Sequence, residues 1–241
     1  ENSTFSTTTP LNQYAVTAHI VRGCSLNQAD LASAGVSGSG IRPIGDNAKI
    51  DGNSIVGGYY VGIRNALTAS YILISNNRIQ IASLANSTAN ISGGFFAAIQ
   101  TGDGVQVVQV ISNSITVNSV VGNYHGITPD AGGSTTGLTV IGNNIYLSNP
   151  DVASSSGIGI RLGASSDVVC VGNNISSNGG TDAASQDMTG IYMTGCTGAV
   201  VDSNTINLGS ISGTKSWRGI QFGDNENCTV SNNRVLSFGK P

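Results

Sequence analysis

Charged residues are scarce in this chain: Asp, Glu, Lys and Arg make up only 10% of its 241 residues, and the formal net charge is −3. Nucleic acids and anionic membranes are bound by basic surfaces, so this composition disfavours both as partners. No apolar run approaches the roughly eighteen residues that a membrane-spanning helix needs. Ser, Thr, Asn, Gln and Gly supply the polarity instead. Such a neutral hydrogen-bonding surface suits sugar hydroxyls and a long-lived extracellular fibre equally well.

The chain has only four cysteines, and none are spaced as Cys-x-x-Cys, the pattern typical of zinc or redox sites. We expect four thiols without disulfides, with Cys24 and Cys170 facing inward as small apolar residues. A cluster of Asp residues that could hold calcium is also missing, and the acidic turn Asp224-Asn225-Glu226 stands alone. No metal site and no cofactor are therefore expected.

Sustained helical periodicity is absent, and in its place one short phrase recurs: an apolar residue, two spacers, Asn, one spacer and an apolar residue. The asparagines of this phrase lie about thirty residues apart, and Cys24 takes their place in a degenerate first copy. Self-similarity at such a period indicates stacked supersecondary units. The asparagines are Asn53, Asn77, Asn113, Asn143, Asn173, Asn204 and Asn233.

A second phrase, a small residue followed by Ile, precedes each full copy of the first by 9 to 13 positions. Every period therefore carries at least two short apolar runs separated by turn residues. We predict an all-β fold, a single-stranded right-handed parallel β-helix (a solenoid) of about seven to eight rungs. Stacked asparagines about 4.8 Å apart would hydrogen-bond through their amides. We also expect each Asn to adopt the left-handed conformation at the bend that ends a strand.

These phrases cover residues 15 to 238, and they resemble those of the right-handed parallel β-helix superfamily. Its members include pectate-lyase-like enzymes, mannuronan epimerases and bacteriophage tailspikes. The resemblance implies the architecture but not one function, because the same repeat serves lyases, hydrolases, epimerases and inert shafts. The stretch Tyr124 to Asp130 is also similar to the Tyr-Gly-Phe/Ile-Asp-Pro-His-Asp signature of mannuronan epimerases, but it lacks the first Asp and the His of that signature.

Residues 1–14 are expected to form an irregular N-terminal arm, and residues 15–241 the β-helix domain. The chain opens with Glu and ends directly after a repeat, without an evident capping element. Because solenoids need caps over their end rungs, we expect the domain to be part of a longer chain or of an assembly. A homotrimer, or capping by other domains, would cover the ends.

Stacking makes neighbours of equal positions in successive coils, about 5 Å apart. The residue after the Ile of the second phrase should point outward and form a column along the solenoid. An extended polysaccharide could bind there, with Arg contacting carboxylates and Tyr stacking on sugar rings. A solvated outer face is the alternative. The column comprises Arg42, Arg64, Gln100, Thr128, Arg161, Tyr192 and Gln221. The substrate-binding residues that we predict are Arg64, Gln100, Tyr124, Arg161 and Tyr192.

Candidate catalytic residues gather near the middle of the chain. His125 and Asp130 belong to one coil, and Asp103 comes from the equivalent turn of the preceding coil. Two carboxylates about 5 to 6 Å apart suit retaining glycoside hydrolysis, and a wider pair suits the inverting route. A His beside an Arg could instead abstract the sugar C5 proton in β-elimination or epimerisation. Whether the chain is an enzyme stays open at this point.

Three functions fit these patterns. The first is a β-helix domain of the bacteriophage tailspike type that binds, and as a depolymerase cleaves, a host-surface polysaccharide. Such a domain would lie on the virion surface or in the extracellular space. The second is a secreted pectate-lyase-like polysaccharide lyase or epimerase. The third is a non-catalytic structural shaft or adhesin.

Overall fold

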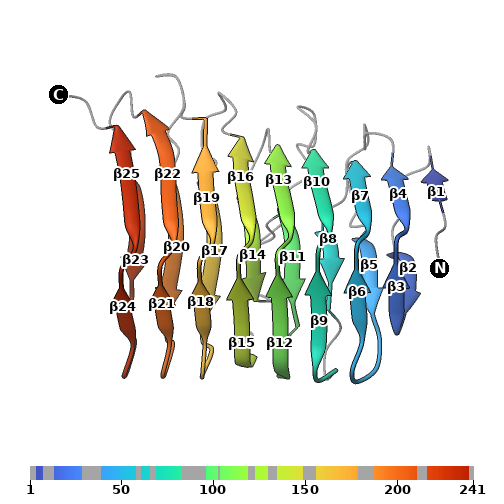
Figure 1. Cartoon of the computed structure of the whole chain (residues 1–241), viewed down its shortest axis with the longest axis horizontal. Coiled ribbons are helices and arrows are strands. Elements are labelled where there is room, and N and C mark those ends of the chain that lie inside the picture. Colours follow the sequence, from blue (N-terminus) through green and yellow to red (C-terminus); the bar gives the residue numbers. More distant parts are fainter. Residues whose placement is uncertain are drawn as a thin grey trace.

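The computed structural model describes residues 4–7, 14–28, 39–57, 61–65, 69–82, 96–102, 104–118, 123–129, 135–148, 156–178, 187–210 and 216–238. Its regular elements are β-strands, which form three parallel sheets, A, B and C. Each coil of the chain adds one strand to each sheet in turn, so that the sheets run along the length of the molecule. Sheets A and C face the viewer in Figure 1, sheet B lies behind them, and the termini lie at opposite ends.

Within each sheet, the strands follow one another along the stack in the order of the sequence. Sheet A consists of β1 (Thr4–Thr7), β4 (Ser25–Gln28), β7 (Ser54–Gly57), β10 (Arg78–Ala82), β13 (Ser114–Asn118), β16 (Asn144–Ser148), β19 (Asn174–Ser177), β22 (Thr205–Ser210) and β25 (Arg234–Phe238). Sheet B consists of β2 (Tyr14–Ala18), β5 (Ser39–Pro43), β8 (Val61–Arg64), β11 (Phe96–Thr101), β14 (Tyr124–Pro129), β17 (Ser156–Gly163), β20 (Asp187–Thr194) and β23 (Trp217–Phe222). Sheet C consists of β3 (Ile20–Arg22), β6 (Lys49–Asp51), β9 (Ile72–Ser75), β12 (Val105–Ile111), β15 (Thr135–Ile141), β18 (Val169–Val171), β21 (Val200–Asp202) and β24 (Thr229–Ser231).

The predicted architecture, an all-β parallel solenoid built from repeats, is confirmed. The chain forms three strands per coil, where the two phrases required at least two. Every connection from sheet A to sheet B contains residues outside the described part of the chain, such as 83–95 between β10 and β11. The number of complete rungs, seven to eight, and the right-handed winding therefore stay predictions.

The expected N-terminal arm is regular in part, because Thr4–Thr7 form strand β1, which pairs in parallel with β4. An unpaired edge of β4 offers backbone hydrogen-bonding groups, and β1 satisfies them. The boundary between an arm and a domain at residue 15 stays a prediction. The remaining residues of the arm, 1–3 and 8–13, lie outside the described ranges.

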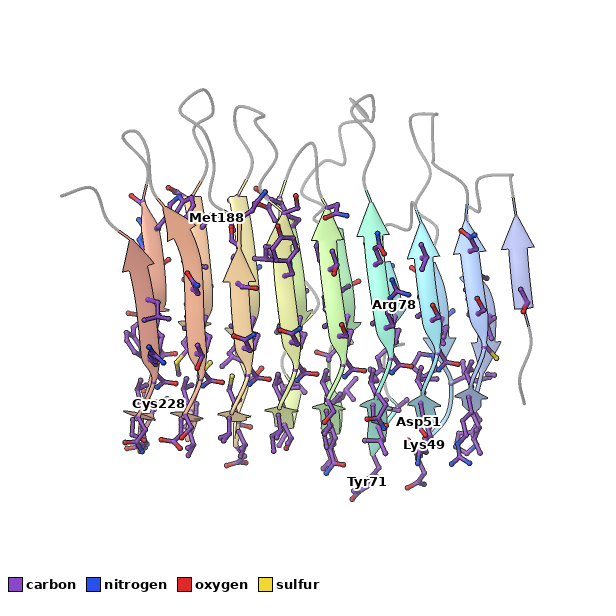
Figure 2. All side chains as sticks on the ribbon, turned by 45° about the horizontal axis from the view of Figure 1, so that its top comes forward. Lys49, Asp51, Tyr71, Arg78, Met188 and Cys228 are labelled. Carbon is purple, nitrogen blue, oxygen red and sulfur yellow. The ribbon has the colours of Figure 1, made fainter. Side chains whose placement is uncertain are left out.

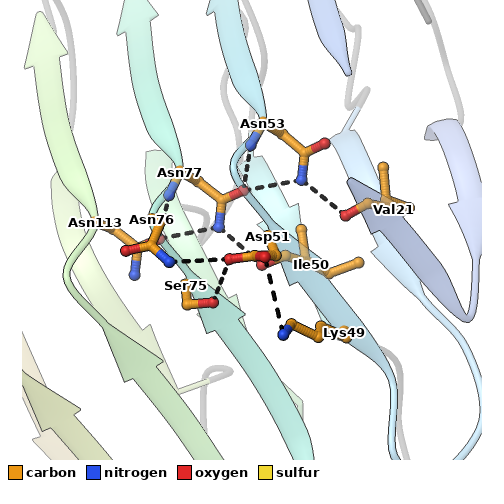
Figure 3. Close-up of polar contacts among 9 residues, drawn as sticks. All are labelled: Val21, Lys49, Ile50, Asp51, Asn53, Ser75, Asn76, Asn77 and Asn113. Atoms are coloured by element: carbon orange, nitrogen blue, oxygen red, sulfur yellow. Dashed lines mark hydrogen bonds and ion pairs between the residues drawn. The ribbon is translucent and has the colours of Figure 1, made fainter. Parts of the chain in front are cut away.

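The recurring asparagines form one continuous ladder at the corner between sheets C and A (Figure 3). Each side-chain oxygen accepts hydrogen bonds from the backbone nitrogen and the side-chain nitrogen of the asparagine one coil earlier, at 2.9 to 3.0 Å. Each side-chain nitrogen also donates to a backbone carbonyl of the preceding coil, as Asn77 does to Ile50. The ladder runs from Asn53 to Asn233, and Cys24 joins it through its backbone nitrogen.

The prediction that these asparagines adopt the left-handed conformation is wrong by one position. The residue before each asparagine has the positive φ, for example Asn76 at 55°, Ser112 at 55° and Gly142 at 64°. The turn at that residue redirects the chain from sheet C to sheet A. The asparagine that follows points its amide inward. There the amide supplies hydrogen-bond partners that the backbone groups at the corner would otherwise lack.

The small residue of the second phrase permits close contact between sheets A and B. A Cβ atom added at Gly159 would lie 2.6 Å from Cγ2 of Ile175 in sheet A and 2.7 Å from the carbonyl oxygen of Gly190. The Ile that follows each asparagine therefore packs against the backbone of sheet B. The core between the three sheets consists of fully buried aliphatic side chains such as Ile55, Ile127 and Val140.

Candidate functional site

The predicted outward column exists on sheet B. Backbone pairing aligns Arg64 with Gln100 and Gln100 with Thr128 in neighbouring strands. Further along the sheet it aligns Arg161 with Tyr192 and Tyr192 with Gln221. The alternation of the strand, read from the two phrases alone, therefore placed these residues on the correct face.

The column is not uniformly accessible. Gln100 and Thr128 are buried, with 4% and 0% of their surface exposed, whereas Arg64, Arg161 and Tyr192 are half-buried. A second outer column lies three positions earlier in each strand. Val61 and Ala97 are fully buried there and form a small cluster of their own. The outer face of sheet B is therefore closed at β11 and β14, and more open from β17 onward except at Thr189, which is buried.

Tyr124 does not lie on this outer face. Its ring is fully buried in the core, and its hydroxyl lies 3.3 Å from Sδ of Met188, two coils further along. Gly157, its neighbour in register, leaves the space that the ring fills. Burial raises the pKa of the Tyr124 hydroxyl. The expectation that Tyr124 contacts substrate is therefore corrected, because side chains alternate between the two faces of a strand.

His125 lies on the opposite face of β14 from Tyr124, and only 4% of it is exposed. Burial, and then the nearby positive charge of Arg161, lower the pKa of His125 to about 3. The imidazole is thus neutral at physiological pH. A neutral histidine next to an arginine is the pair that abstraction of a C5 proton would require, but its burial separates this ring from a polymer on the surface.

The two predicted catalytic carboxylates, Asp103 and Asp130, lie outside the described residues. Their separation, and with it the choice between retaining and inverting hydrolysis, stays a prediction. Of the described residues that flank them, Gly102 and Pro129 are buried, whereas Gly104 is exposed.

The open part of the sheet B face carries a group of polar side chains that we name the Arg161 patch: Arg161, Thr189, Tyr192, Arg218 and Gln221. The guanidinium carbon of Arg161 lies 5.9 Å from the centre of the Tyr192 ring, within reach of a cation–π contact. Gln221 accepts hydrogen bonds from Arg218, at 3.4 Å, and from Thr189, at 3.5 Å. Together they present two guanidinium groups, one aromatic ring and one amide on three successive strands.

Sequence reasoning included Arg161, Tyr192 and Gln221 in the outward column but missed Arg218 and Thr189. Both lie three positions before a column member, on the same face of their strands, and backbone pairing aligns them with each other. The second phrase could have predicted this second outer column, three positions before the first.

The profiles of known protein families and the curated proteins give no match to this chain. The argument for its function therefore rests on its own residues.

The other expectations about the chain can be compared with the structure directly. All four cysteines are thiols, and Cys24, Cys170 and Cys196 are buried, which confirms the expected absence of disulfides and the inward direction of Cys24 and Cys170. Within the ranges that the structure describes, no group of three His, Cys, Asp or Glu side chains is arranged to hold a metal ion. Over the same ranges, no helix has the length and hydropathy to cross a membrane.

Proposed function

We propose that this chain is a glycan-binding β-helix domain of the bacteriophage tailspike type, which binds an acidic bacterial surface polysaccharide along the outer face of sheet B. The observation that carries the proposal is the contact of Arg161 with Tyr192 on the outer face of sheet B. Arg binds carboxylates through paired hydrogen bonds, and the Tyr ring offers an apolar face to a sugar.

The spacing of the Arg161 patch supports an extended ligand. Arg161, Tyr192 and Gln221 occupy three successive strands, so they are spaced by about 4.8 Å each. Successive charged sugars of a polymer could therefore contact more than one of these side chains at once. Multiple weak contacts along a repeating ligand give a larger total affinity than any one contact.

Binding is favoured over cleavage by the position of His125. A general base must come within hydrogen-bonding distance of the proton that it removes, and His125 is almost fully buried. Depolymerase activity through Asp103 and Asp130 remains part of the proposal, together with a location on the virion surface or in the extracellular space. The right-handed coil of seven to eight rungs belongs to the same proposal, together with capping of the end coils by other domains in place of a homotrimer.

Isothermal titration of the protein with purified acidic capsular polysaccharides and with a neutral glucan tests the binding function. We expect binding to the acidic polymer, and Arg161→Ala should weaken it by about tenfold or more, because one charge-assisted contact is lost. Arg78→Ala removes the same charge from the outer face of sheet A and should leave affinity unchanged. Equal loss in both variants would show that only net charge matters, and would refute the proposed face.

Incubation of the same polysaccharides with the protein tests the catalytic part. New reducing ends would indicate hydrolysis, and absorbance from unsaturated uronates would indicate elimination. Substitution of Asp103 or Asp130 by Ala should abolish product if these carboxylates act as proposed. Product formed at an unchanged rate by both variants would exclude them.

A non-catalytic shaft is the second candidate, and the asparagine ladder favours it. Seven asparagines in one hydrogen-bonded series join all coils from Asn53 to Asn233, which suits a stiff fibre under load. A shaft would bind none of the polysaccharides and yield no product. The two experiments above separate these functions.

A further inference from the structure

The outer face of sheet C carries an aliphatic strip that the glycan-binding proposal does not use. Two outward columns run along this sheet, and backbone pairing aligns their members coil by coil. The half-buried or exposed aliphatic side chains on them are Ile20, Leu73, Ile111, Ile141, Val169, Val171 and Val200. Val200 has 39% of its surface exposed.

Sheet A of the same solenoid serves as an internal comparison. Its first outer column contains only Ser, Thr, Asn and Arg, in the order Ser25, Ser54, Arg78, Ser114, Asn144, Asn174, Thr205 and Arg234. The β-solenoid therefore does not itself require apolar residues on an outer face. Parallel sheets are usually covered on both faces, and contiguous exposed apolar patches in soluble proteins mark interaction sites.

Polar groups bound the strip at both ends in the same way. Near the N-terminal end, Asp51 accepts hydrogen bonds from Ser75 and Asn76, at 2.7 and 3.0 Å (Figure 3). Near the C-terminal end, Asp202 accepts them from Ser231 and Asn232, at 2.6 and 2.9 Å. Figure 2 shows Lys49 and Asp51 together at the lower edge of the molecule, where the first of these groups lies.

The order of residues along the strip is close to a palindrome centred on Ile141. The inner of the two columns reads Arg22, Asp51, Ser75, Ile111, Ile141, Val171, Asp202 and Ser231, and the palindrome runs from Asp51 to Ser231 with Arg22 beyond its end. Reversal of this order sets Ile111 opposite Val171. It also sets each carboxylate opposite a hydroxyl, Asp51 against Ser231 and Asp202 against Ser75. The other column reads Ile20, Lys49, Leu73, Gln109, Thr139, Val169, Val200 and Thr229. Its reversal sets Leu73 opposite Val200 and leaves one mismatch, Gln109 opposite Val169.

From this symmetry we infer that the outer face of sheet C is the interface of an antiparallel homodimer, with a twofold axis through Ile141 parallel to the strands. A twofold axis in that direction reverses the stack of coils and places each column against its own copy. An isologous interface of this kind requires a self-complementary surface, and the palindrome supplies one. No carboxylate faces another carboxylate in this arrangement.

A dimer with the two stacks parallel fits less well. A twofold axis along the stack sets each coil against its own copy and exchanges the two columns. Ile111 would then face Gln109, and Ile141 would face Thr139. The Asp202 carboxylate would face Val200, and a charge against an aliphatic group loses solvation without gaining a partner. The antiparallel arrangement avoids each of these contacts.

The size of the strip sets the expected strength of association. From Lys49 to Thr229 it spans six steps of the stack, about 29 Å, and it is only one strand wide. The strip therefore covers roughly 300 Å² per chain, well below the roughly 800 Å² per partner of a standard specific interface, so we expect weak association, in the high micromolar range.

Sedimentation equilibrium of the whole chain, carried to high micromolar concentration, tests the dimer. We expect a mass of two chains that dissociates on dilution. Ile141→Lys places two like charges on the axis and should raise the dissociation constant about 100-fold, because each charge is buried without a partner. Ser114→Lys, at an exposed position on the outer face of sheet A, should leave it unchanged. Circular dichroism of each variant confirms that the fold is retained.

A charge exchange tests the antiparallel direction. Ile111→Lys and Val171→Asp should each weaken the dimer, whereas the double variant should recover it, because residue 111 of one copy faces residue 171 of the other. Within one chain these two side chains are two coils apart, so they interact little with each other. A monomer at every concentration, a trimer, a dimer unaffected by Ile141→Lys, or a double variant no better than the single ones would each overturn the inference. None of these outcomes depends on whether the sheet B face binds a glycan.

Discussion

The side-chain oxygen of Asn143 lies 3.0 Å from both the backbone nitrogen and the side-chain nitrogen of Asn113. One amide oxygen thus satisfies two buried donors of the preceding coil, and the side-chain nitrogen of Asn143 repeats the interaction with Asn173. Chains of such bonds polarise one another, and each buried group without its partner is costly. The corner of the solenoid therefore depends on an unbroken series of asparagines.

Asn143→Ala should lower the free energy of unfolding by roughly 2 to 3 kcal/mol, because it leaves the buried backbone nitrogen of Asn113 without an acceptor and removes one acceptor of its side-chain nitrogen. Urea unfolding followed by circular dichroism measures the change. Asn233→Ala at the half-buried end of the ladder is the matched control and should cost clearly less. Equal losses at the two positions would contradict the importance of burial.

Gly159→Ala should destabilise the fold by about 1 to 3 kcal/mol, because the new methyl group overlaps Ile175 and the carbonyl oxygen of Gly190. The thermal unfolding midpoint of the variant provides the measurement. Ala98 occupies the same column in another coil, so Ala98→Gly adds no atom and should cost less. A Gly159→Ala variant as stable as the original chain would show that sheets A and B can separate at little cost.

Acid should weaken the fold through His125. Its pKa in the folded chain is lowered to about 3, first by burial and then by the charge of Arg161. In the unfolded chain an ordinary histidine titrates near pH 6.5, so between these values only the unfolded chain binds the proton. The free energy of unfolding should therefore fall as the pH is lowered from about 6.5 toward 3, and this contribution should be complete above pH 6.5.

Urea midpoints measured from pH 7 to pH 4 test that dependence. His125→Gln should flatten the curve relative to the original chain. His19→Gln, which replaces the other histidine at an exposed position, is the matched control. If the flattening fails to appear, protonation of His125 is not what weakens the fold in acid.

Thiol reactivity should follow burial. Cys228 is half-buried, whereas burial raises the pKa of Cys170 to about 12, so that almost none of its reactive thiolate exists at neutral pH. A disulfide reagent should therefore modify one thiol per native chain quickly, and all four only after denaturation. Cys228→Ser should remove the fast reaction, and Cys170→Ser should not. Rapid modification of a Cys228→Ser chain would disprove the assignment.

Much of the fold could be predicted from the sequence, because each coil of a solenoid repeats the same arrangement of strands and turns. The alignment of Asn77, Asn113, Asn143 and Asn173 in a single file follows from their common phrase. The second phrase likewise predicted the register of Arg161 with Tyr192. Such positions are determined by local pattern, since each coil pairs only with its neighbours.

The candidate site could be read only in part. Alternation within a strand distinguishes inward from outward, but it does not say whether something else covers an outward residue. Gln100 and His125 point outward and are nevertheless buried, whereas Arg161 and Tyr192 remain accessible. Tyr124 was misplaced because its burial depends on the space left by Gly157 in the next coil.

The sequence by itself determined the coil, its corner asparagines and which side chains alternate outward, because these depend on spacing along the chain. Only the tertiary structure decided which outward residues reach solvent, since burial depends on segments far apart in sequence. It also revealed the symmetric order of side chains on sheet C. These side chains form one surface only because seven segments that are distant in sequence are stacked in register.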